Sequence, residues 1–539
     1  MEGSWVWWLA LGPAALALSA LRSDRAADAE PALQARLGIA AGSLAFAAAI
    51  GGAILLALRG PAHSGTLGAA GIGLSIGFDS LTAIVLLLVS LVGLVVLRYS
   101  RNYLAGDPGQ GRFIRWLSLT LAAVLMLILS GNVALFALAW VATSIGLQRL
   151  LRFYPDRPAA VLAARKKFIT GRIADLCLLA AAVLAWRQFG SLDHRELASD
   201  IAALGAGAVP GSVHAIALLV VVAALLKSAQ FPLHGWLLEV METPTPVSAL
   251  LHAGIVNAGG FLLLRHADLV SASPAAMALL LVVGGLSALA GSVAMLAQTS
   301  VKVALAWSTI AQLGFMMLQC GLGAWSAALL HLVAHSLYKA HAFLSSGSVV
   351  DLARASTTLS PGGRAHPARL ALALAIVLGA AFGVGTLAGA TLVSQPGSVA
   401  LGAIVMLGLV HYVVGAIDER NSGYVLGRAL ATAIGVAALY YTLQWLAAAL
   451  TRGTLPPPRA LASDLELALV LLVVASFAAL TLLQARLPGP AADPRWLALH
   501  AHAANGFYVN TLANRLVIRF WPAPPPRASN APHPAGAGT

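Results

Sequence analysis

Long apolar runs recur along the whole chain and limit what it can fold into. Most approach the roughly 20 residues that an α-helix needs to cross a bilayer. They occupy residues 6–21, 37–58, 81–97, 117–150, 174–186, 215–226, 274–297, 325–350, 368–393, 399–416, 427–450 and 464–484. A lipid-facing β-barrel would alternate apolar and polar residues, whereas these runs are continuous. The sequence therefore predicts an all-α polytopic membrane protein with about 14–16 transmembrane helices.

Basic residues are concentrated in alternate loops, although the formal net charge of +13 would also suit a nucleic-acid partner. The third and fifth predicted helices are followed by arginine-rich segments, 98–115 and 149–172, whereas residues 60–78 contain no Lys or Arg. This asymmetry is typical of membrane proteins, whose cytoplasmic loops carry the surplus of basic residues. We expect a multi-pass protein of the bacterial inner membrane, with its N-terminus outside and its C-terminal tail in the cytoplasm. Anionic lipid, rather than nucleic acid, is the expected partner of the basic segments.

Two cysteines, Cys177 and Cys320, both lie in apolar runs and form no metal-ligand pattern. We therefore expect neither a metal nor another cofactor in this chain.

A lysine and a proline interrupt the apolar stretch between residues 215 and 241, at Lys227 and Pro232. Proline removes a backbone hydrogen bond, so the helix should break there. Broken helices inside a membrane are tolerated only where they contact protein or water, and they recur at the ion sites of transporters. Pro244 and Pro246 then mark the turn into the next predicted helix, 247–264. A lysine that extends to the membrane surface is the simpler alternative for Lys227.

Histidines and a second lysine continue this polar line. His252 lies in the helix that follows the break, and His331, His335 and Lys339 recur every four residues in the run 325–350. Residues four apart in an α-helix lie on one face, so these three side chains form one stripe. Because histidine can accept a proton at one ring nitrogen and give one up at the other, such a stripe is suited to proton transfer.

Other ionisable residues are weaker candidates. Glu239 and Glu242, beside the proline turn, could form a cytoplasmic entrance or an ordinary solvated turn, and Lys302 could support it. His341, off the stripe, and His411 are more simply explained as core histidines. Asp175 could act as a counter-charge to Lys227 or form an interfacial ion pair with Arg172.

The segment KSAQFPLHGWLLEVMETPTPVSALLHAG (227–254) resembles the core motif of the proton-channel subunits of respiratory complex I and of multisubunit sodium/proton antiporters. Further similar segments follow the family order over roughly residues 70–350. They are the segments that begin at Phe78 and Arg172, the Lys302 to Gly314 stretch, the His331/His335/Lys339 helix and, in the tail, the segment that begins at Asn505. The resemblance implies an antiporter-like fold with inverted repeats, and a proton or cation path through Lys227, His252, His331, His335 and Lys339.

This sequence departs from the pattern of the respiratory subunits at two places. The respiratory subunits carry a glutamate after the tryptophan of their fifth helix, whereas here Trp140 is followed by Val141. Their second broken helix contains a Gly-Phe-Phe-Ser-Lys-Asp-Glu segment, and no similar segment follows residue 368. The resemblance therefore implies only the first part of the respiratory proton path.

The details of the core motif resemble a particular branch, the DabB membrane subunits of two-component inorganic carbon accumulation systems. That resemblance implies a cation-conducting, non-enzymatic subunit of a CO2/bicarbonate uptake complex. It also implies a DabA-like partner on the cytoplasmic side, a large zinc protein that resembles β-carbonic anhydrase. Three alternatives stay open: a subunit of a redox-driven quinone or hydrogenase complex, a subunit of a sodium/proton antiporter, and a membrane anchor that conducts no ions.

Six regions are expected on this basis. They are the N-terminal helices and outer hairpin (1–110), a first antiporter-like repeat (111–270), a second, degenerate repeat (271–420), C-terminal helices (421–484), an amphipathic cytoplasmic tail (485–522) and a disordered end (523–539).

Overall fold

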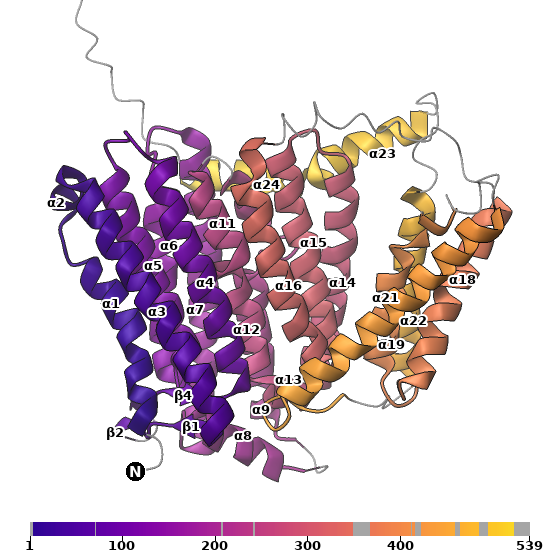
Figure 1. The fold of residues 1–539 in the computed structure, drawn as a ribbon, viewed down its shortest axis with the longest axis horizontal. Helices are drawn as coiled ribbons and strands as arrows, with labels where there is room; N and C mark the ends of the chain where they lie inside the picture. The colour runs from indigo at the N-terminus through magenta and orange to yellow at the C-terminus, as the bar shows by residue number, and fades with distance from the viewer. Residues whose placement is uncertain are drawn as a thin grey trace, which may run out of the picture.

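The computed structural model describes residues 4–69, 72–205, 209–240, 243–348, 367–410, 412–414, 422–458, 464–484 and 494–521. Within these ranges the chain is an array of helices that run roughly parallel to one another, with two short strand pairs at one end (Figure 1). Eleven of the helices are long and apolar enough to cross a membrane, and three shorter helices are apolar as well. The predicted all-α membrane fold with many spans is confirmed.

The helices, 3-10 turns and strands follow one another along the chain with the bounds given next. They are η1 (Ser4–Ala10), α1 (Leu11–Ser19), α2 (Asp24–Ala29), α3 (Pro31–Arg59), β1 (Ala62–His63), β2 (Leu67–Ala69), β3 (Ile72–Leu74), β4 (Gly77–Phe78), α4 (Ser80–Tyr103), α5 (Gln110–Leu129), α6 (Val133–Leu151), α7 (Pro158–Phe189), α8 (His194–Ala203), α9 (Gly211–Lys227), α10 (Gly235–Glu239), α11 (Thr245–Ala253), η3 (Ile255–Asn257), α12 (Ala258–Arg265), α13 (Ala267–Ser271), α14 (Pro274–Leu296), α15 (Val301–Gly321), α16 (Trp325–Leu344), η4 (Ser346–Ser348), α18 (Pro367–Leu387), α19 (Pro396–Leu407), α21 (Ser422–Leu450), α22 (Asp464–Gln484), α23 (Pro494–Ala504), η5 (Gly506–Tyr508) and α24 (Val509–Phe520).

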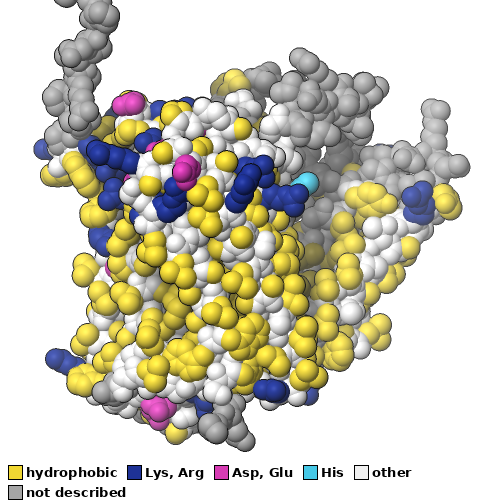
Figure 2. Space-filling model, turned by 60° about the vertical axis from the view of Figure 1, so that its left-hand side comes forward, with side chains coloured by type: hydrophobic (Ala, Val, Ile, Leu, Met, Phe, Trp, Pro, Cys, Tyr) yellow, Lys and Arg dark blue, Asp and Glu magenta, His cyan; other side chains and the backbone are white. Residues whose placement is uncertain are grey.

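The molecule has two chemically different ends. The strands, α8 and α13 lie at one end, which we call the hairpin end, and α2, α23 and α24 lie at the other (Figure 1). Lys and Arg side chains gather along that second end, whereas the surface between the two ends is largely hydrophobic (Figure 2). We call the second end, with α2, α23 and α24, the basic end. The N-terminal turn η1 lies at the hairpin end and the amphipathic helix α24 at the basic end (Figure 1).

The glycine-rich segment 60–79 forms the predicted hairpin. Strand β1 pairs antiparallel with β4, and β2 pairs antiparallel with β3. The side chain of Asn132, in the turn between α5 and α6, donates hydrogen bonds to the Gly73 carbonyl (2.8 Å) and to Ser75 Oγ (2.6 Å). These hydrogen bonds fix the hairpin onto the end of the helical bundle. The same turn divides the apolar run 117–150 into two helices.

Two hydrophobic cores hold the helices together. The larger core joins helices from η1 to α16, and a second core joins α18, α19 and α21. Helix α21 also packs against α16 and connects the two groups (Figure 1). The candidate path residues in α9 to α16 therefore belong to the larger core.

Some predicted loops contain helices. The outer segment 187–213 contains α8, and the basic segment 149–172 contains the first part of α7, which begins at Pro158. The segment after residue 485 contains α23 and α24. Residues 351–366 and the predicted disordered end 523–539 lie outside the described residues.

Candidate cation path

The apolar stretch 215–241 is broken as its proline predicts. Helix α9 ends at Lys227, α10 begins at Gly235, and Pro232 lies between them. The lysine is therefore the last helical residue before the break, and it is only 4% exposed. A charge buried in a membrane protein is costly unless it finds partners, so its surroundings decide what it can do.

Three oxygens of α6 surround the Lys227 ammonium. Its Nζ donates to the Trp140 carbonyl (3.3 Å), to Thr143 Oγ1 (3.1 Å) and to Ser144 Oγ (3.0 Å). The ammonium also lies 4.2 Å from the centroid of the Trp140 ring, a favourable cation–π position. All three N–H groups of a protonated lysine thus have a partner. Among the described residues no carboxylate lies within ion-pair distance of it, which agrees with the valine at position 141.

Asp175 does not fill the place of the missing glutamate directly. It is buried and forms an ion pair with Arg172 on the same helix, with 2.6 Å between Asp175 Oδ2 and Arg172 Nη2. A second buried lysine, Lys167, approaches instead, and its Nζ donates to the Ser144 carbonyl (3.3 Å). Ser144 therefore contacts two lysines, one through its hydroxyl and one through its backbone.

A second break, which the sequence reading did not predict, lies beside the first. The expected helix 247–264 is divided into α11 and α12 by the 3-10 turn η3. Ser228, directly after Lys227, donates from Oγ to the Val256 carbonyl in that turn (3.0 Å). The next residue, Asn257, donates to Ser336 Oγ on α16 (2.7 Å). The two breaks are thus hydrogen-bonded to each other and to the histidine-bearing helix.

A glycine allows this close approach. A Cβ atom on Gly259, at the start of α12, would lie 2.2 Å from Ser228 Oγ and 2.5 Å from the Ala224 carbonyl oxygen. Close packing therefore explains why a glycine, Gly259, stands at this position of the Asn257-Ala-Gly-Gly segment.

The stripe on α16 faces the interior as its spacing predicts. The rings of His331 and His335 lie 6.0 Å apart, and His331 Nδ1 contacts Gln319 Oε1 at 2.9 Å. Lys339 is fully buried, and its Nζ donates to the Leu305 carbonyl on α15 (3.0 Å). His341, which lies off the stripe, is exposed.

His252 joins this group through α15. Its Nδ1 lies 3.0 Å from Thr309 Oγ1, and the Thr309 hydroxyl donates its own proton to the Leu305 carbonyl, the acceptor that also serves Lys339. The threonine oxygen must therefore accept from His252 Nδ1, which leaves Nε2 of the neutral ring as a proton acceptor. Nε2 of His252 and Nε2 of His335 are both buried and have no hydrogen-bond partner among the described residues. The arrangement can therefore take up and pass on protons, with water between its members.

The chain resembles proteins of known families over most of its length. Residues 130–389 match the family described as the transmembrane part of NADH:quinone oxidoreductase and Mrp antiporters, and residues 66–114 match the N-terminus of complex I chain 5. A protein of Halothiobacillus neapolitanus named "Probable inorganic carbon transporter subunit DabB2" is 41% identical over 481 residues, which cover 87% of this chain and 86% of that protein. The chain belongs to the DabB family.

Another DabB protein, a quinone oxidoreductase chain and a solved antiporter structure are also similar to this chain. A DabB protein of Hydrogenovibrio crunogenus is 46% identical over 51% of this chain and 53% of its own length. Chain 5 of the NAD(P)H-quinone oxidoreductase of Synechocystis is 40% identical, over 50% of this chain and 40% of its own length. Among solved structures, the Mrp complex from Dietzia sp. has a TM-score of 0.62 at 24% identity over 95% of this chain and 59% of that chain. That structural likeness supports the antiporter-like fold.

Of the remaining candidates in this DabB-family chain, Lys302 lies in the first turn of α15. Lys302 Nζ donates to Thr245 Oγ1 (3.3 Å) at the start of α11, where Pro244 precedes the helix and Pro246 lies in its first turn. Glu242 and His411 lie outside the described residues. In the described part of the chain, no group of three or more His, Cys, Asp or Glu side chains could hold a metal ion.

Glu239 belongs to a polar network that the sequence reading missed. Its Oε1 lies 2.7 Å from Lys166 Nζ and accepts hydrogen bonds from Asn510 (3.1 Å) and Asn514 (2.8 Å) of α24. Lys166 Nζ also donates to the side-chain oxygens of both asparagines (2.7 and 2.6 Å). The network connects α7, the segment after the first break and the C-terminal helix. The four-residue spacing of the asparagines was the available signal, because it places both on one face of α24.

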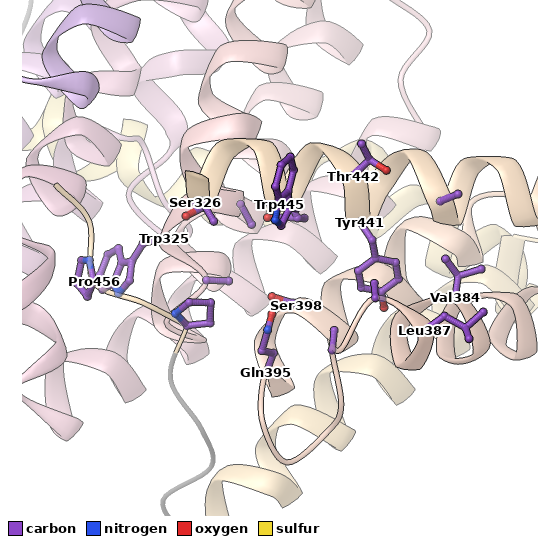
Figure 3. A pocket seen from close by; sticks show the side chains of 18 residues that line it. Trp325, Ser326, Val384, Leu387, Gln395, Ser398, Tyr441, Thr442, Trp445 and Pro456 are labelled. Carbon is purple, nitrogen blue, oxygen red and sulfur yellow. The ribbon is translucent and has the colours of Figure 1, made fainter. Parts of the chain in front are cut away.

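A cavity of about 580 Å³ lies away from this path, between the start of α16 and helices α18, α19 and α21 (Figure 3). Trp325, Tyr441 and Trp445 line it, and none of its lining residues is Lys, Arg, His, Asp or Glu. It is therefore not part of the cation path.

Proposed function

We propose that this protein is the cation-conducting membrane subunit of an energy-coupled inorganic carbon uptake complex, and that the conducted cation is the proton. One observation carries the proposal: hydrogen bonds join the segment after Lys227 to the second break, and the second break to α16. Ser228, next to Lys227, donates to the Val256 carbonyl, and Asn257 donates to Ser336, the chain neighbour of His335. The other ionisable members of this polar line are His252, His331 and Lys339.

The chemistry of the line favours protons. Each end of the line holds a lysine whose ammonium is bound by neutral oxygens. When such a lysine loses its proton, its charge leaves as well, and no carboxylate loses a positively charged partner. The histidines between them can take and give protons at separate ring nitrogens. A sodium path would instead be expected to offer several carboxylate or carbonyl oxygens around one position.

The proposed partner is a DabA-like zinc protein, bound at the basic end on the cytoplasmic side. The names of the relatives support the inorganic carbon role, and the basic end carries the amphipathic helix α24 as an accessible element. On this proposal the N-terminus faces the outside of the bacterial inner membrane, since the surplus of basic residues marks the cytoplasmic side. The partner would hydrate CO2 to bicarbonate, while protons moving inward through this chain supply the energy.

Growth of a carbonic-anhydrase-deficient bacterial host in ambient air tests the proposal. The chain, expressed with the partner gene from the same gene cluster, should restore growth, and each gene alone should not. The variants Lys227→Ala and Lys339→Ala should abolish the rescue while the protein still accumulates in the membrane. Parent-like rescue by both variants would exclude a role of these lysines in conduction.

A redox-driven complex is the second candidate, because the Synechocystis quinone oxidoreductase chain is 40% identical over 50% of this chain. Purification of the chain with its native partners separates the two. One large zinc-containing protein supports carbon uptake, whereas flavin and iron–sulfur subunits would support a redox complex.

A further inference from the structure

A second group of buried titratable residues lies at the hairpin end, apart from the line described above. It contains His63 of β1, Asp193 and His194 at the start of α8, and His266 between α12 and α13. His63 Nε2 lies 3.2 Å from Asp193 Oδ2, and the side chains of this pair are 7% and 11% exposed. The rings of His194 and His266 lie 5.0 Å apart. Four elements thus bring four ionisable groups together.

The backbone holds this group in place. The amide of His194 donates to the Gly131 carbonyl (3.1 Å), and Asp193 Oδ1 accepts from the amide of Arg195 (2.9 Å) at the start of α8. A Cβ atom on Gly131 would lie 2.6 Å from His63 Nε2, so the hairpin sits tightly on the α5–α6 turn. The group is therefore built into the fold and does not result from flexible surface side chains.

Two of the histidines have the free nitrogens that proton transfer needs. Both ring nitrogens of His194 are buried and have no hydrogen-bond partner among the described residues. His266 Nδ1 lies 3.0 Å from the Leu262 carbonyl and so donates to it, which leaves Nε2 of the neutral ring as an acceptor. A buried polar atom without a partner is costly, so it needs a reason such as a bound water or proton.

Burial, with the basic groups that face it, keeps His194 neutral at rest. These groups are His266 and Arg265 at the end of α12 and His63 on the hairpin, and Arg265 is itself paired with Asp79 (2.6 Å). Burial first, and then the repulsion between a protonated His194 and these basic groups, lowers the pKa of His194 well below its usual value. A neutral imidazole can accept an incoming proton and release it again, whereas a permanently charged one would block the site.

Buried aromatic rings separate this group from Lys227. Phe136 meets His194 and His266 edge-on, with 6.2 Å between ring centroids in each case. On its other side it contacts Trp140 at 6.0 Å, the ring on which the Lys227 ammonium lies. Phe136 and Trp140 are both fully buried. Phe136 and then Trp140 therefore lie in a chain of contacts between the His194/His266 pair and the Lys227 ammonium.

We propose that His63, Asp193, His194 and His266 form a proton-binding port at the hairpin end of the path, which the Phe136 ring separates from Lys227. The port rests on the proposed function, since it supplies protons to the lysine line. Its ligand is a proton, carried on water that reaches the slightly exposed His63–Asp193 pair. Opening the barrier requires only that the Phe136 side chain move and admit water.

Potential-driven proton flux in liposomes tests the port, with the purified complex of this chain and its partner. His194→Phe keeps an aromatic ring but cannot carry a proton, so flux should fall by about tenfold or more. His266→Gln can still donate to the Leu262 carbonyl and should lower flux as well, which covers the case that the first variant does not fold. Phe136→Ala should raise flux above that of the parent, because it removes the barrier. His341→Phe, at an exposed histidine, is the matched control and should conduct like the parent.

The outcomes separate the two proposals. Parent-like flux in both His194→Phe and His266→Gln, together with loss of flux in Lys227→Arg, would overturn the port and leave the lysine line intact. Parent-like flux in Lys227→Arg would overturn the proposed function and the port together. A Phe136→Ala complex that conducts no more than the parent would show that this ring is not the barrier.

Discussion

At the residue scale, the unusual feature is a buried lysine that has no carboxylate partner among the described residues. The hydroxyls of Thr143 and Ser144 and the Trp140 carbonyl accept all three of its N–H groups. Neutral acceptors stabilise the ammonium less strongly than a carboxylate would. A lysine held by neutral acceptors therefore gives up its proton more easily than one that is paired with a carboxylate.

Two of the three histidines of α16, His335 and His341, give a matched pair of variants. His335→Gln removes a buried imidazole from the stripe, whereas His341→Gln changes an exposed residue six positions away on the same helix. We expect His335→Gln to reduce the air-growth rescue at least about tenfold, because glutamine cannot exchange protons. Growth rates in ambient air and in CO2-enriched air measure the effect. Equal rescue by both variants would remove His335 from the path.

The buried His266 predicts how stability depends on pH. Burial lowers its pKa to about 4, from an ordinary value near 6.5. The unfolded chain binds the proton more readily than the folded chain does, so stability should fall as the pH drops from about 6.5 to about 4, by roughly 3 kcal/mol for this residue. His266→Gln should flatten this dependence. Melting temperatures in detergent between these pH values provide the measurement, and an unchanged slope in the variant would contradict it.

At the element scale, two neighbouring helix breaks and the polar network of Lys166, Glu239, Asn510 and Asn514 organise the candidate path. We call this network the C-terminal clamp. The first break could be predicted because a lysine and a proline interrupt an apolar run. The second could not, since no proline marks it and glycine is frequent within membrane-spanning helices. The hydrogen bond from Ser228 that meets this turn depends on how the helices pack. The clamp of Lys166 and Glu239 to α24 joins residues more than 270 positions apart, a distance over which spacing carries no information.

The stripe on α16, by contrast, could be predicted from sequence alone. Residues four apart share a helix face whatever the rest of the fold does. The partners of the stripe, Leu305 and Thr309 on α15, could not be predicted, because helix packing decides which carbonyl and which hydroxyl face it. The same limit concealed the burial of Lys166 and Lys167, which the basic pattern of the segment placed in a loop.

The clamp predicts that alanine substitutions at two glycines, Gly235 and Gly211, affect stability very differently. A Cβ atom on Gly235 would lie 2.0 Å from Asn510 Oδ1, whereas one on Gly211 would meet nothing within 4 Å. Gly235→Ala should therefore displace α24 and cost about 1–3 kcal/mol through the lost hydrogen bonds. Gly211→Ala should be neutral. Melting in detergent and the rate of tail proteolysis report both effects, and equal behaviour of the two variants would argue against the clamp.

At the scale of the whole molecule, the two ends differ in chemistry. The hairpin end carries the His63–Asp193 pair, and the basic end carries the clamp and α24 (Figure 1). On the proposed function, protons that enter at the hairpin end and leave at the basic end would reach a partner bound there. The fold class could be predicted from run length, since a bilayer sets the length of a spanning helix. The direction of insertion stays a prediction from charge.

Cysteine accessibility in whole cells measures the orientation. In a background with Cys177 and Cys320 replaced by serine, Arg195→Cys at the hairpin end should react with a membrane-impermeant thiol reagent added outside. Arg25→Cys at the basic end should react only after the cells are opened. Both arginines are exposed, so access depends on the side of the membrane. The reverse pattern of labelling would reverse the proposed direction.

The central claim is that Lys227 conducts by releasing its proton. Potential-driven proton flux through the purified complex in liposomes, compared between the parent and Lys227→Arg, tests it most directly. Arginine keeps the positive charge but is not deprotonated in proteins, so it separates charge from proton exchange. We predict that Lys227→Arg assembles with its partner and shows no more flux than empty liposomes. Flux equal to that of the parent would contradict the account.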